Sequence, residues 1–364
     1  MIPAGDNPPL LSFRFGKEGT PINPVFIIGT ERSGTNLLRL ILDAHPNIAV
    51  PHPPHIVKLF GPLTPRYGEL SDDRNFRRLI ADVCRMVELH PYPWEIRPDR
   101  ERVFREARDR SLISIYFAIY DQYLAATGKK RWACKSTFMI DQVAEILRYH
   151  PGARFVYLVR DGRDVAVSAR GSIFNHFHPY YSALRWRREQ ETGLSWLTKL
   201  PPEQIMLLRY EELTADPRGM TERLCAFLDE PFAARMLDYY RQPEARKSGS
   251  LSISWQNTAR PVMRGNTEKF RTELSAGEIL LFEAICYREL QALGYPLTHP
   301  VAELMGLHEE MLRPRPAYRA TELLLKLKAE ARHLTKDRNS LLRLKKILFM
   351  NYLGLARRGS SPDA

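Results

Sequence analysis

The sequence predicts an α/β protein in which helices flank a parallel β-sheet. Short apolar runs alternate along the chain with longer stretches of helical periodicity, which is the pattern of strands joined by right-handed helical crossovers. A glycine-containing loop joins the first apolar run directly to a helical pattern. The 364 residues, 44% of them hydrophobic, are also enough to bury a large core.

The elements follow in order along the chain. Strands are expected at residues 25–28, 132–134, 154–159 and 205–208, with helices after them from residue 36, over 140–149, from about 164 and over 217–228. Residues 66–125 carry no clear strand pattern and are expected to form a helical insertion beside the first loop, where it would supply an acceptor-binding wall. Ser275 and Glu278 form a capping-box pattern, which opens a helix that stops near Gly294 and closes the core.

We divide the chain into a lead-in over residues 1–23, one domain over 24–299 and a basic helical extension over 300–364. The lead-in lacks the charged-then-apolar pattern of a secretion signal. The extension carries leucines at helical spacing among many Lys and Arg residues. We favour a helix packed on the core or on a second subunit, as in a homodimer, over a helix on a membrane surface.

The charge and cysteine content narrow the class of partner. A formal net charge of +12 and a pI of about 9.6 favour an anionic partner. No basic patch is interleaved with aromatic residues, so we do not expect a nucleic acid. The four cysteines lie far apart without C-x-x-C spacing, which indicates neither zinc nor disulfides. No run approaches the ~18 apolar residues of a membrane span, so we expect a cytoplasmic protein that is at most peripheral at the membrane.

Residues 29–36, Gly-Thr-Glu-Arg-Ser-Gly-Thr-Asn, form a phosphate-binding loop without its usual lysine. The general P-loop pattern ends in Gly-Lys-Ser/Thr, but here Thr35 and Asn36 stand at those two positions, and the cation is Arg32. A nucleoside triphosphatase needs that lysine and a hydroxyl for Mg²⁺. We therefore expect a phosphate-bearing ligand and metal-independent chemistry. An ordinary strand-to-helix turn is the alternative.

A second motif follows the buried run at residues 154–159. Arg160 ends this expected strand, and Ser168 lies in the next helix. Both side chains can face the crevice at the carboxyl ends of the strands, where ligands of open α/β sheets bind. A guanidinium and a hydroxyl suit a second phosphate. The alternative is a surface turn of salt bridges.

Together the two motifs resemble those of sulfotransferases that use 3′-phosphoadenosine 5′-phosphosulfate (PAPS). Residues 42–46, Leu-Asp-Ala-His-Pro, are most similar to the branch of tyrosylprotein and bacterial sulfotransferases. The resemblance implies that the first loop holds the 5′-phosphosulfate and that Arg160 and Ser168 hold the 3′-phosphate. The loop residues concerned are Arg32, Ser33, Gly34, Thr35 and Asn36.

The same resemblance extends to five later positions. It implies that Lys135 contacts the sulfonate and its leaving oxygen, and that Tyr210 lies near the adenine. Arg264, Gly265 and Lys269 fall in a segment similar to the late loop that closes over the nucleotide. Without the resemblance, Lys135 is equally a solvated lysine and Tyr210 a core residue.

The general base departs from the family pattern. The tyrosylprotein branch has a glutamate where this chain has residues 50–55, Val-Pro-His-Pro-Pro-His. A histidine suits base chemistry near neutral pH, so we favour His52, with His55 close behind. Glu31 is disfavoured because a carboxylate in the loop opposes the bound anion.

The sequence therefore predicts a sulfotransferase that moves the sulfuryl group in line from PAPS to a hydroxyl. The acceptor is a sugar, a lipid, a small molecule or a protein tyrosine. Two alternatives remain, namely a P-loop nucleotide kinase or ATPase and a non-enzymatic protein that binds nucleic acid or membrane.

Overall fold

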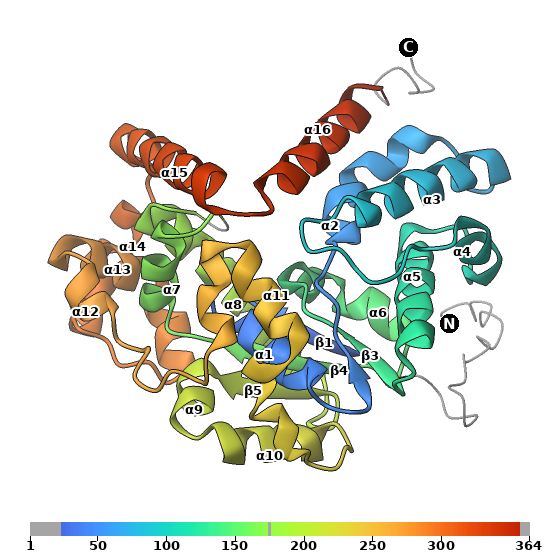
Figure 1. The fold of residues 1–364 in the computed structure, drawn as a ribbon. Coiled ribbons are helices and arrows are strands. Elements are labelled where there is room, and N and C mark those ends of the chain that lie inside the picture. Colours follow the sequence, from blue (N-terminus) through green and yellow to red (C-terminus); the bar gives the residue numbers. More distant parts are fainter. Residues whose placement is uncertain (1–22, 174–175, 357–364) are drawn as a thin grey trace, which may run out of the picture.

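A computed structural model describes residues 23–173 and 176–356, so nearly all of the lead-in lies outside the described residues. Its centre is a five-stranded parallel sheet in the order β2-β3-β1-β4-β5 (Figure 1). The strands are β1 (Val25–Gly29), β2 (Ile48–Ala49), β3 (Arg131–Cys134), β4 (Arg154–Val159) and β5 (Ile205–Arg209). The predicted α/β class is confirmed, and β2 is an addition that is too short to recognise by pattern.

The strand order reverses at β1, which places the ligand crevice there. The chain moves to one side of β1 for β2 and β3 and to the other side for β4 and β5. In open α/β sheets the crevice at such a switch point binds ligands. Strands β1 and β4 approach closely at Gly29, where an added Cβ would lie 2.2 Å from the Leu158 carbonyl oxygen. The loop that leaves β1 therefore starts beside β4.

Helices cover both faces of the sheet. Their bounds are α1 (Thr35–Asp43), α2 (Ile56–Phe60), α3 (Asp73–Glu88), α4 (Arg100–Glu106), α5 (Leu112–Thr127), α6 (Val143–Tyr149), α7 (Gly162–Arg170), α8 (Pro179–Lys199), α9 (Tyr210–Ala215), α10 (Pro217–Phe227), α11 (Pro243–Leu251), α12 (Phe270–Glu273), α13 (Ala276–Ala292), α14 (Val301–Met311), α15 (Pro316–Lys336) and α16 (Ser340–Ala356). Alternate residues of β1 enter two different cores. Phe26 and Ile28 pack with α3, α5 and α8, whereas Val25 and Ile27 pack with α1 and α10.

The expected helical insertion is present as α3, α4 and α5. Asp72, Asp99 and Ser111 cap the three helices through their side chains, each accepting from a backbone N–H in the first turn. Helix α5 is buried along most of its length. The capping box of Ser275 and Glu278 also forms, with both of its reciprocal bonds. The start of α13 was therefore predicted from its local sequence.

The extension forms three helices, α14 and then α15 and α16, which are separated by a break at residues 337–339. Asp337 accepts hydrogen bonds from Ser252 Oγ at 3.0 Å and the Ile253 N–H at 2.9 Å, and Asn339 Nδ2 donates to the Pro91 carbonyl at 3.2 Å. These contacts hold the break against the core. Helix α14 packs on α13, while α15 and α16 diverge from the body of the molecule (Figure 1).

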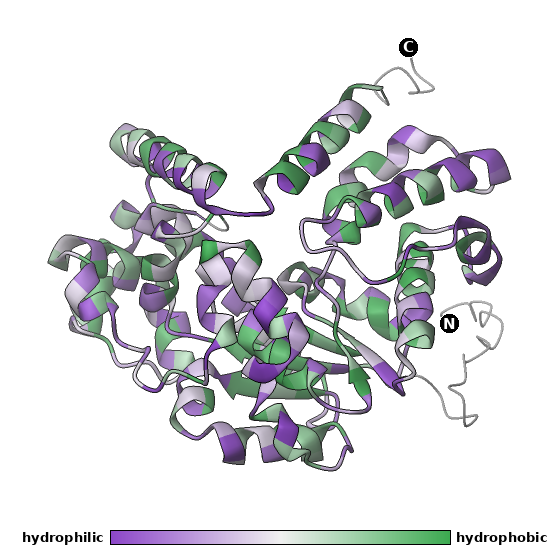
Figure 2. Ribbon diagram, in the orientation of Figure 1, coloured by the Kyte–Doolittle hydropathy of each residue, from purple (hydrophilic) through white to green (hydrophobic). Residues whose placement is uncertain are grey.

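Packing of this amphipathic region on the core is therefore only partial. Much of the α16 ribbon is green, the colour of hydrophobic residues, in Figure 2, and many leucines of α15 and α16 are exposed. In the part of the chain that the structure describes, no helix has both the length and the hydropathy needed to cross a membrane.

Candidate functional site

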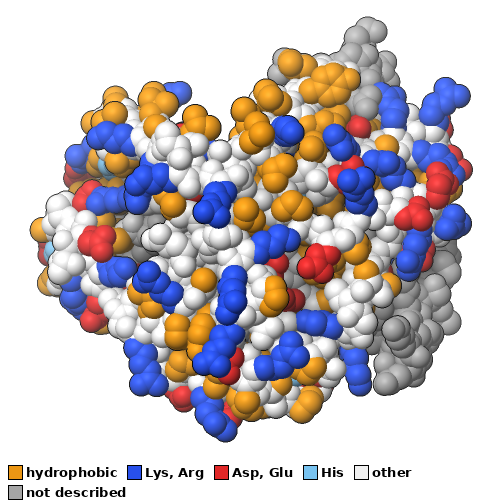
Figure 3. Space-filling model, viewed as in Figure 1, with side chains coloured by type: hydrophobic (Ala, Val, Ile, Leu, Met, Phe, Trp, Pro, Cys, Tyr) orange, Lys and Arg blue, Asp and Glu red, His pale blue; other side chains and the backbone are white. Residues whose placement is uncertain are grey.

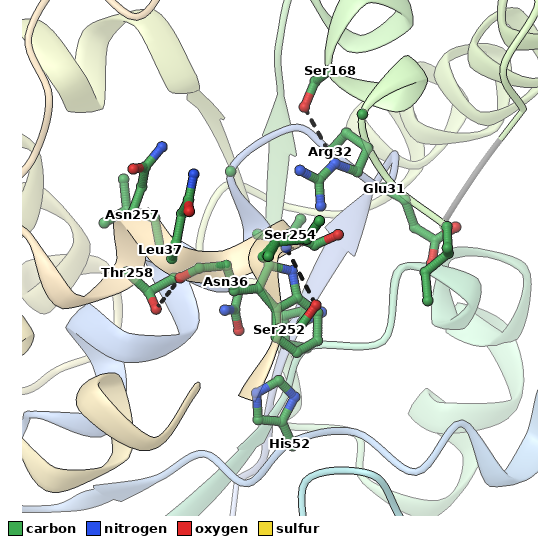
Figure 4. Close-up of a pocket in the computed structure, with 18 of the residues that line it drawn as sticks. Glu31, Arg32, Asn36, Leu37, His52, Ser168, Ser252, Ser254, Asn257 and Thr258 are labelled. Carbon is green, nitrogen blue, oxygen red and sulfur yellow. Dashed lines mark hydrogen bonds between the residues drawn. The ribbon is translucent and has the colours of Figure 1, made fainter. Parts of the chain in front are cut away.

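A cavity of about 780 Å³ opens at the carboxyl ends of the central strands. Its walls come from segments far apart in the sequence. They are the loop after β1, residues 52–55, residues 90–92, Lys135, helix α7, residues 252–258, the loop before α12, and residues 332–346 of the extension. Figure 4 shows labelled side chains from several of these segments converging on one space. The predicted insertion contributes only its segment at residues 90–92 to this wall.

The loop after β1 has the shape of an anion cradle. Arg32 and Gly34 adopt left-handed backbone angles, with φ of 73° and 88°. Helix α1 begins immediately afterwards at Thr35, so its free N–H groups point toward the loop. The ring of Tyr210 packs on Gly34 so closely that an added Cβ would lie 2.3 Å from it. The loop therefore needs glycine at this position for both its angle and its space.

Three buried polar atoms at the cradle have no hydrogen-bond partner among the described residues. They are Ser33 Oγ, Asn36 Nδ2 and Arg160 Nε. Buried polar atoms are normally paired, so unpaired ones call for a ligand or water. Two of the three are nitrogen donors, and all three lie at positions predicted to hold a phosphate. The residues present therefore fit a phosphate-bearing co-substrate.

The two predicted phosphate motifs meet in space. Arg32 Nε donates to Ser168 Oγ at 3.2 Å, and Arg160 Nη1 donates to the Arg32 carbonyl oxygen at 3.3 Å. Figure 4 shows the Arg32 and Ser168 side chains pointing toward one another. The Arg160 guanidinium also lies 4.5 Å from the centre of the Tyr210 ring. Burial and the nearby charge of Arg160 lower the pKa of Arg32 to about 10.

The predicted late loop is only partly in the cavity. Lys269 lines it, whereas Arg264 and Gly265 lie in an exposed turn outside the lining. Asn266 lines the cavity instead; its carbonyl accepts from Arg160 Nη2 at 2.9 Å and its Nδ2 donates to Tyr210 Oη at 2.7 Å. A left-handed φ of 74° at Gly265 forms the turn that leads away from the site.

Lys135 follows β3 directly and lines the cavity. Its side chain is buried, and its Nζ lies 5.6 Å from the centre of the Trp255 ring. Burial, with the positive charge of Arg39 second, lowers the pKa of Lys135 to about 8. Lys135 is therefore a cation at pH 7 whose charge is poorly solvated, and an incoming anion would relieve that cost.

His52 forms an aromatic cluster with Tyr92 and Trp255, whose own ring centroids lie 4.4 Å apart. Its ring stacks on Tyr92 with centroids 4.2 Å apart and on Trp255 with centroids 4.6 Å apart. His52 Nε2 lies 3.1 Å from Ser248 Oγ, which also accepts from Arg39 Nη2 at 3.1 Å. Burial, followed by the charges of Arg39 and Lys135, holds the pKa of His52 well below 6.5. The ring is therefore neutral at pH 7.

His55 reaches the same cavity from a different direction. It adopts a left-handed φ of 58° before α2, and its Nδ1 lies 3.0 Å from Ser136 Oγ. Burial and the charge of Lys135 hold the pKa of His55 well below 6.5 as well. Both predicted base candidates thus line one cavity with Lys135. Glu31 is engaged elsewhere, since its carboxylate pairs with Arg185 at 2.9 Å.

Sequence reasoning missed several residues of this site. His90 lines the cavity, and burial lowers its pKa to about 3. Arg39 is fully buried and bonds Asn36 Oδ1 at 2.8 Å and the Val50 carbonyl at 3.0 Å. Lys346 arrives from the extension. An arginine amid the apolar residues of α1 was the one available signal, because the rest depends on contacts between distant segments.

Comparison with known proteins shows the family and the fold. The profile of the Sulfotransferase family matches residues 24–234. An uncharacterized protein of Aquifex aeolicus (strain VF5) is 27% identical over 68% of this chain, and a protein-tyrosine sulfotransferase of Drosophila melanogaster is 21% identical over 76%. The chain spans only 30% and 52% of the length of these two relatives. Protein-tyrosine sulfotransferase 1 of Homo sapiens is 24% identical over 76% of this chain and 70% of its own length.

A solved structure shares the fold. The sulfotransferase domain from the curacin biosynthetic pathway superposes with a TM-score of 0.52 at 21% identity, covering 76% of this chain and 99% of that domain. At this identity the likeness concerns the fold alone. The profile match over residues 24–234 covers more than half of the chain, and the protein therefore belongs to the Sulfotransferase family.

Proposed function

We propose that this protein transfers the sulfuryl group of PAPS to a hydroxyl of an acceptor, in line and without a metal ion. The observation that carries the proposal is the union of the two anion motifs, in which Arg32 of the cradle donates to Ser168 at 3.2 Å. Family membership supports sulfuryl transfer over the kinase and the non-enzymatic binder. The acceptor classes remain sugar, lipid, small molecule and protein tyrosine.

PAPS supplies an activated sulfuryl group on a 5′-phosphate and a separate 3′-phosphate. The cradle amides and the unpaired atoms of Ser33 and Asn36 would hold the 5′ end. Arg160, with its free Nε, and Ser168 would hold the 3′-phosphate through charge-assisted hydrogen bonds. Arg32 belongs to the first motif and contacts Ser168 and Arg160 of the second. It therefore lies between the proposed sites of the 5′-phosphosulfate and the 3′-phosphate.

Arg32 and Lys135 would supply the fixed positive charge of the reaction. In sulfuryl transfer, negative charge grows on the leaving phosphate oxygen, and cations already aimed at that place lower the barrier. Both side chains line the cavity, and among the described residues neither forms an ion pair with a carboxylate that the ligand would have to break. Their burial makes each charge more effective than it would be in water.

His52 would accept the proton of the acceptor hydroxyl. Ser248 Oγ lies 3.4 Å from Glu244 Oε1, and when it donates there, His52 Nε2 carries the proton and Nδ1 is the acceptor atom. A neutral ring at pH 7 is the form that can act as a base. The negative charge of a bound nucleotide would raise the pKa of His52 from its depressed value.

Thermal unfolding with two nucleotides tests the proposal. We expect adenosine 3′,5′-bisphosphate with a metal chelator to raise the melting temperature, because a ligand that binds only the folded state stabilises it. Arg160→Ala should remove most of that shift. Stabilisation by Mg²⁺-ATP alone would contradict the proposal and would favour the alternative function of a nucleotide kinase or ATPase.

A radioactive labelling experiment can identify the acceptor. Incubation of the protein and ³⁵S-labelled PAPS with fractionated cell extract should yield one labelled product, and its identification would name the acceptor class. The Lys135→Ala protein serves as the control, since its fold should persist while transfer is lost. Equal labelling by both proteins would show that the label does not come from this site.

A further inference from the structure

Helix α15 presents an apolar stripe to solvent. Leu323, Leu327 and Leu334 are 58%, 59% and 59% exposed. At about 100° per residue they lie within ~40° of one another around the helix. The buried residues of this helix, Ala329 and His333, lie ~80–160° away from the stripe around the helix. The stripe therefore results from the helical spacing and is turned away from the core.

Helix α16 repeats the arrangement. Leu341, Leu344, Leu348 and Leu355 are between 45% and 66% exposed and lie within ~60° around the helix. Lys346, which lines the cavity, lies on the opposite side. We call these four leucines, with the three of α15, the docking face. Figure 3 shows hydrophobic side chains gathered over both diverging helices, with Lys and Arg among them.

The charge of the two helices that carry the docking face is mostly positive. Residues 316–356 contain nine Lys and Arg residues and three acidic residues. All three acids bond within the chain. Glu322 accepts from the Phe177 and His178 N–H groups, Glu330 pairs with Arg343, and Asp337 bonds Ser252. The acids are thus used internally, and most of the cations remain for an external anion.

We propose that α15 and α16 dock the protein on an anionic membrane surface. Exposed leucines flanked by cations match a bilayer interface, in which acyl chains accept the leucines and anionic headgroups bind the cations. A second copy of the chain fits less well, because a two-fold interface would set this cationic face against itself. Since Arg332, Arg343 and Lys346 line the cavity, docking brings the cavity mouth to the membrane.

Vesicle sedimentation of the full chain tests the proposal. The probes are phosphatidylcholine vesicles with and without phosphatidylglycerol. We expect binding to the anionic vesicles, with affinity about tenfold lower without phosphatidylglycerol or at high salt. The variant Leu344→Glu/Leu348→Glu should also bind about tenfold more weakly. The matched control is Met305→Glu, at an apolar residue of α14 that is 58% exposed, and it should bind as the native chain does.

Three results would overturn docking. They are absence of native binding to the anionic vesicles, equal binding by the double variant, and a stable dimer that the double variant dissociates. Stabilisation by adenosine 3′,5′-bisphosphate reports whether the double variant is folded. Vesicle binding needs no nucleotide, so failure of the proposed function would leave this result interpretable.

Discussion

Positive charges held out of water are the main feature of the cavity at the scale of single residues. Burial lowers the pKa of Lys135 and of Lys346 to about 8, and that of Arg32 to about 10. Each of these cations is less stable than it would be in water, so a bound anion gains more from them. The same burial keeps His52 neutral.

The pH profile should reveal Lys135. Its positive charge is present below its pKa of about 8 and is lost as pH rises through that value. We therefore expect kcat/KM for PAPS to fall above about pH 8, because this parameter reports the free enzyme. Lys135→Arg should shift the fall to higher pH, since arginine stays charged. Steady-state rates across the range measure it, and an unmoved fall would assign the effect to another group.

Replacing His52 should separate chemistry from nucleotide binding. We expect His52→Ala to lower kcat by about 10²–10⁴-fold, the usual contribution of a general base. Stabilisation by adenosine 3′,5′-bisphosphate should stay near the native value, because His52 lies outside the cradle. His45→Ala, at a buried histidine outside the cavity lining, is the matched control and should retain activity. If the His52→Ala protein is fully active, His55 becomes the candidate general base, and His55→Ala would test that assignment directly.

At the scale of elements, the cradle depends on one turn between β1 and α1. Gly34 has a left-handed φ of 88°, and the Tyr210 ring occupies the space where a Cβ would lie. The ring in turn holds Arg160 and Asn266. One glycine thus connects the 5′ side of the proposed nucleotide site to its 3′ side.

Substitution of Gly34 should affect stability and nucleotide binding together. We expect Gly34→Ala to cost about 1–3 kcal/mol of unfolding free energy, from backbone strain and displacement of the Tyr210 ring. It should also abolish the melting shift with adenosine 3′,5′-bisphosphate. Gly277→Ala is the control, because nothing lies within 4 Å of its added Cβ. Chemical denaturation measures the unfolding free energy of both variants. Equal stability of the two variants would contradict the packing argument.

At the scale of the whole molecule, the extension belongs to the site. Lys346 of α16 donates to the Pro54 carbonyl at 3.4 Å, between the two candidate bases in sequence, and it lines the cavity. Burial, with the charge of Lys58 second, lowers its pKa to about 8. A segment nearly 300 residues away in sequence thus supplies a cation to the cavity wall.

Removing that cation should reduce transfer without unfolding the protein. We expect Lys346→Met to keep or raise the melting temperature, since it replaces a buried charge by an apolar chain of similar length. Sulfuryl transfer should fall several-fold, while adenosine 3′,5′-bisphosphate binds normally. A labelling assay with the acceptor fraction measures the fall. If transfer is unchanged, Lys346 has only a structural role.

The sequence by itself determined four strands of the sheet, the loop that forms the cradle, and the second motif with Arg160 and Ser168. Apolar runs separated by helical periodicity mark β1, β3, β4 and β5, because period and length are local properties. The loop at residues 29–36 and the pair Arg160 and Ser168 are also readable, because they are set by residue type at the ends of strands. These elements were predicted within a few residues of their observed bounds.

Only the tertiary structure decided which side chains share the cavity. The cluster of His52 with Tyr92 and Trp255, the buried Arg39 and the position of Lys346 in the cavity wall all depend on contacts between segments distant in sequence. The break at residues 337–339 likewise depends on Ser252 and Pro91. Such contacts carry no local periodicity, because they arise from packing and charge burial between elements, and one sequence does not state which elements will meet.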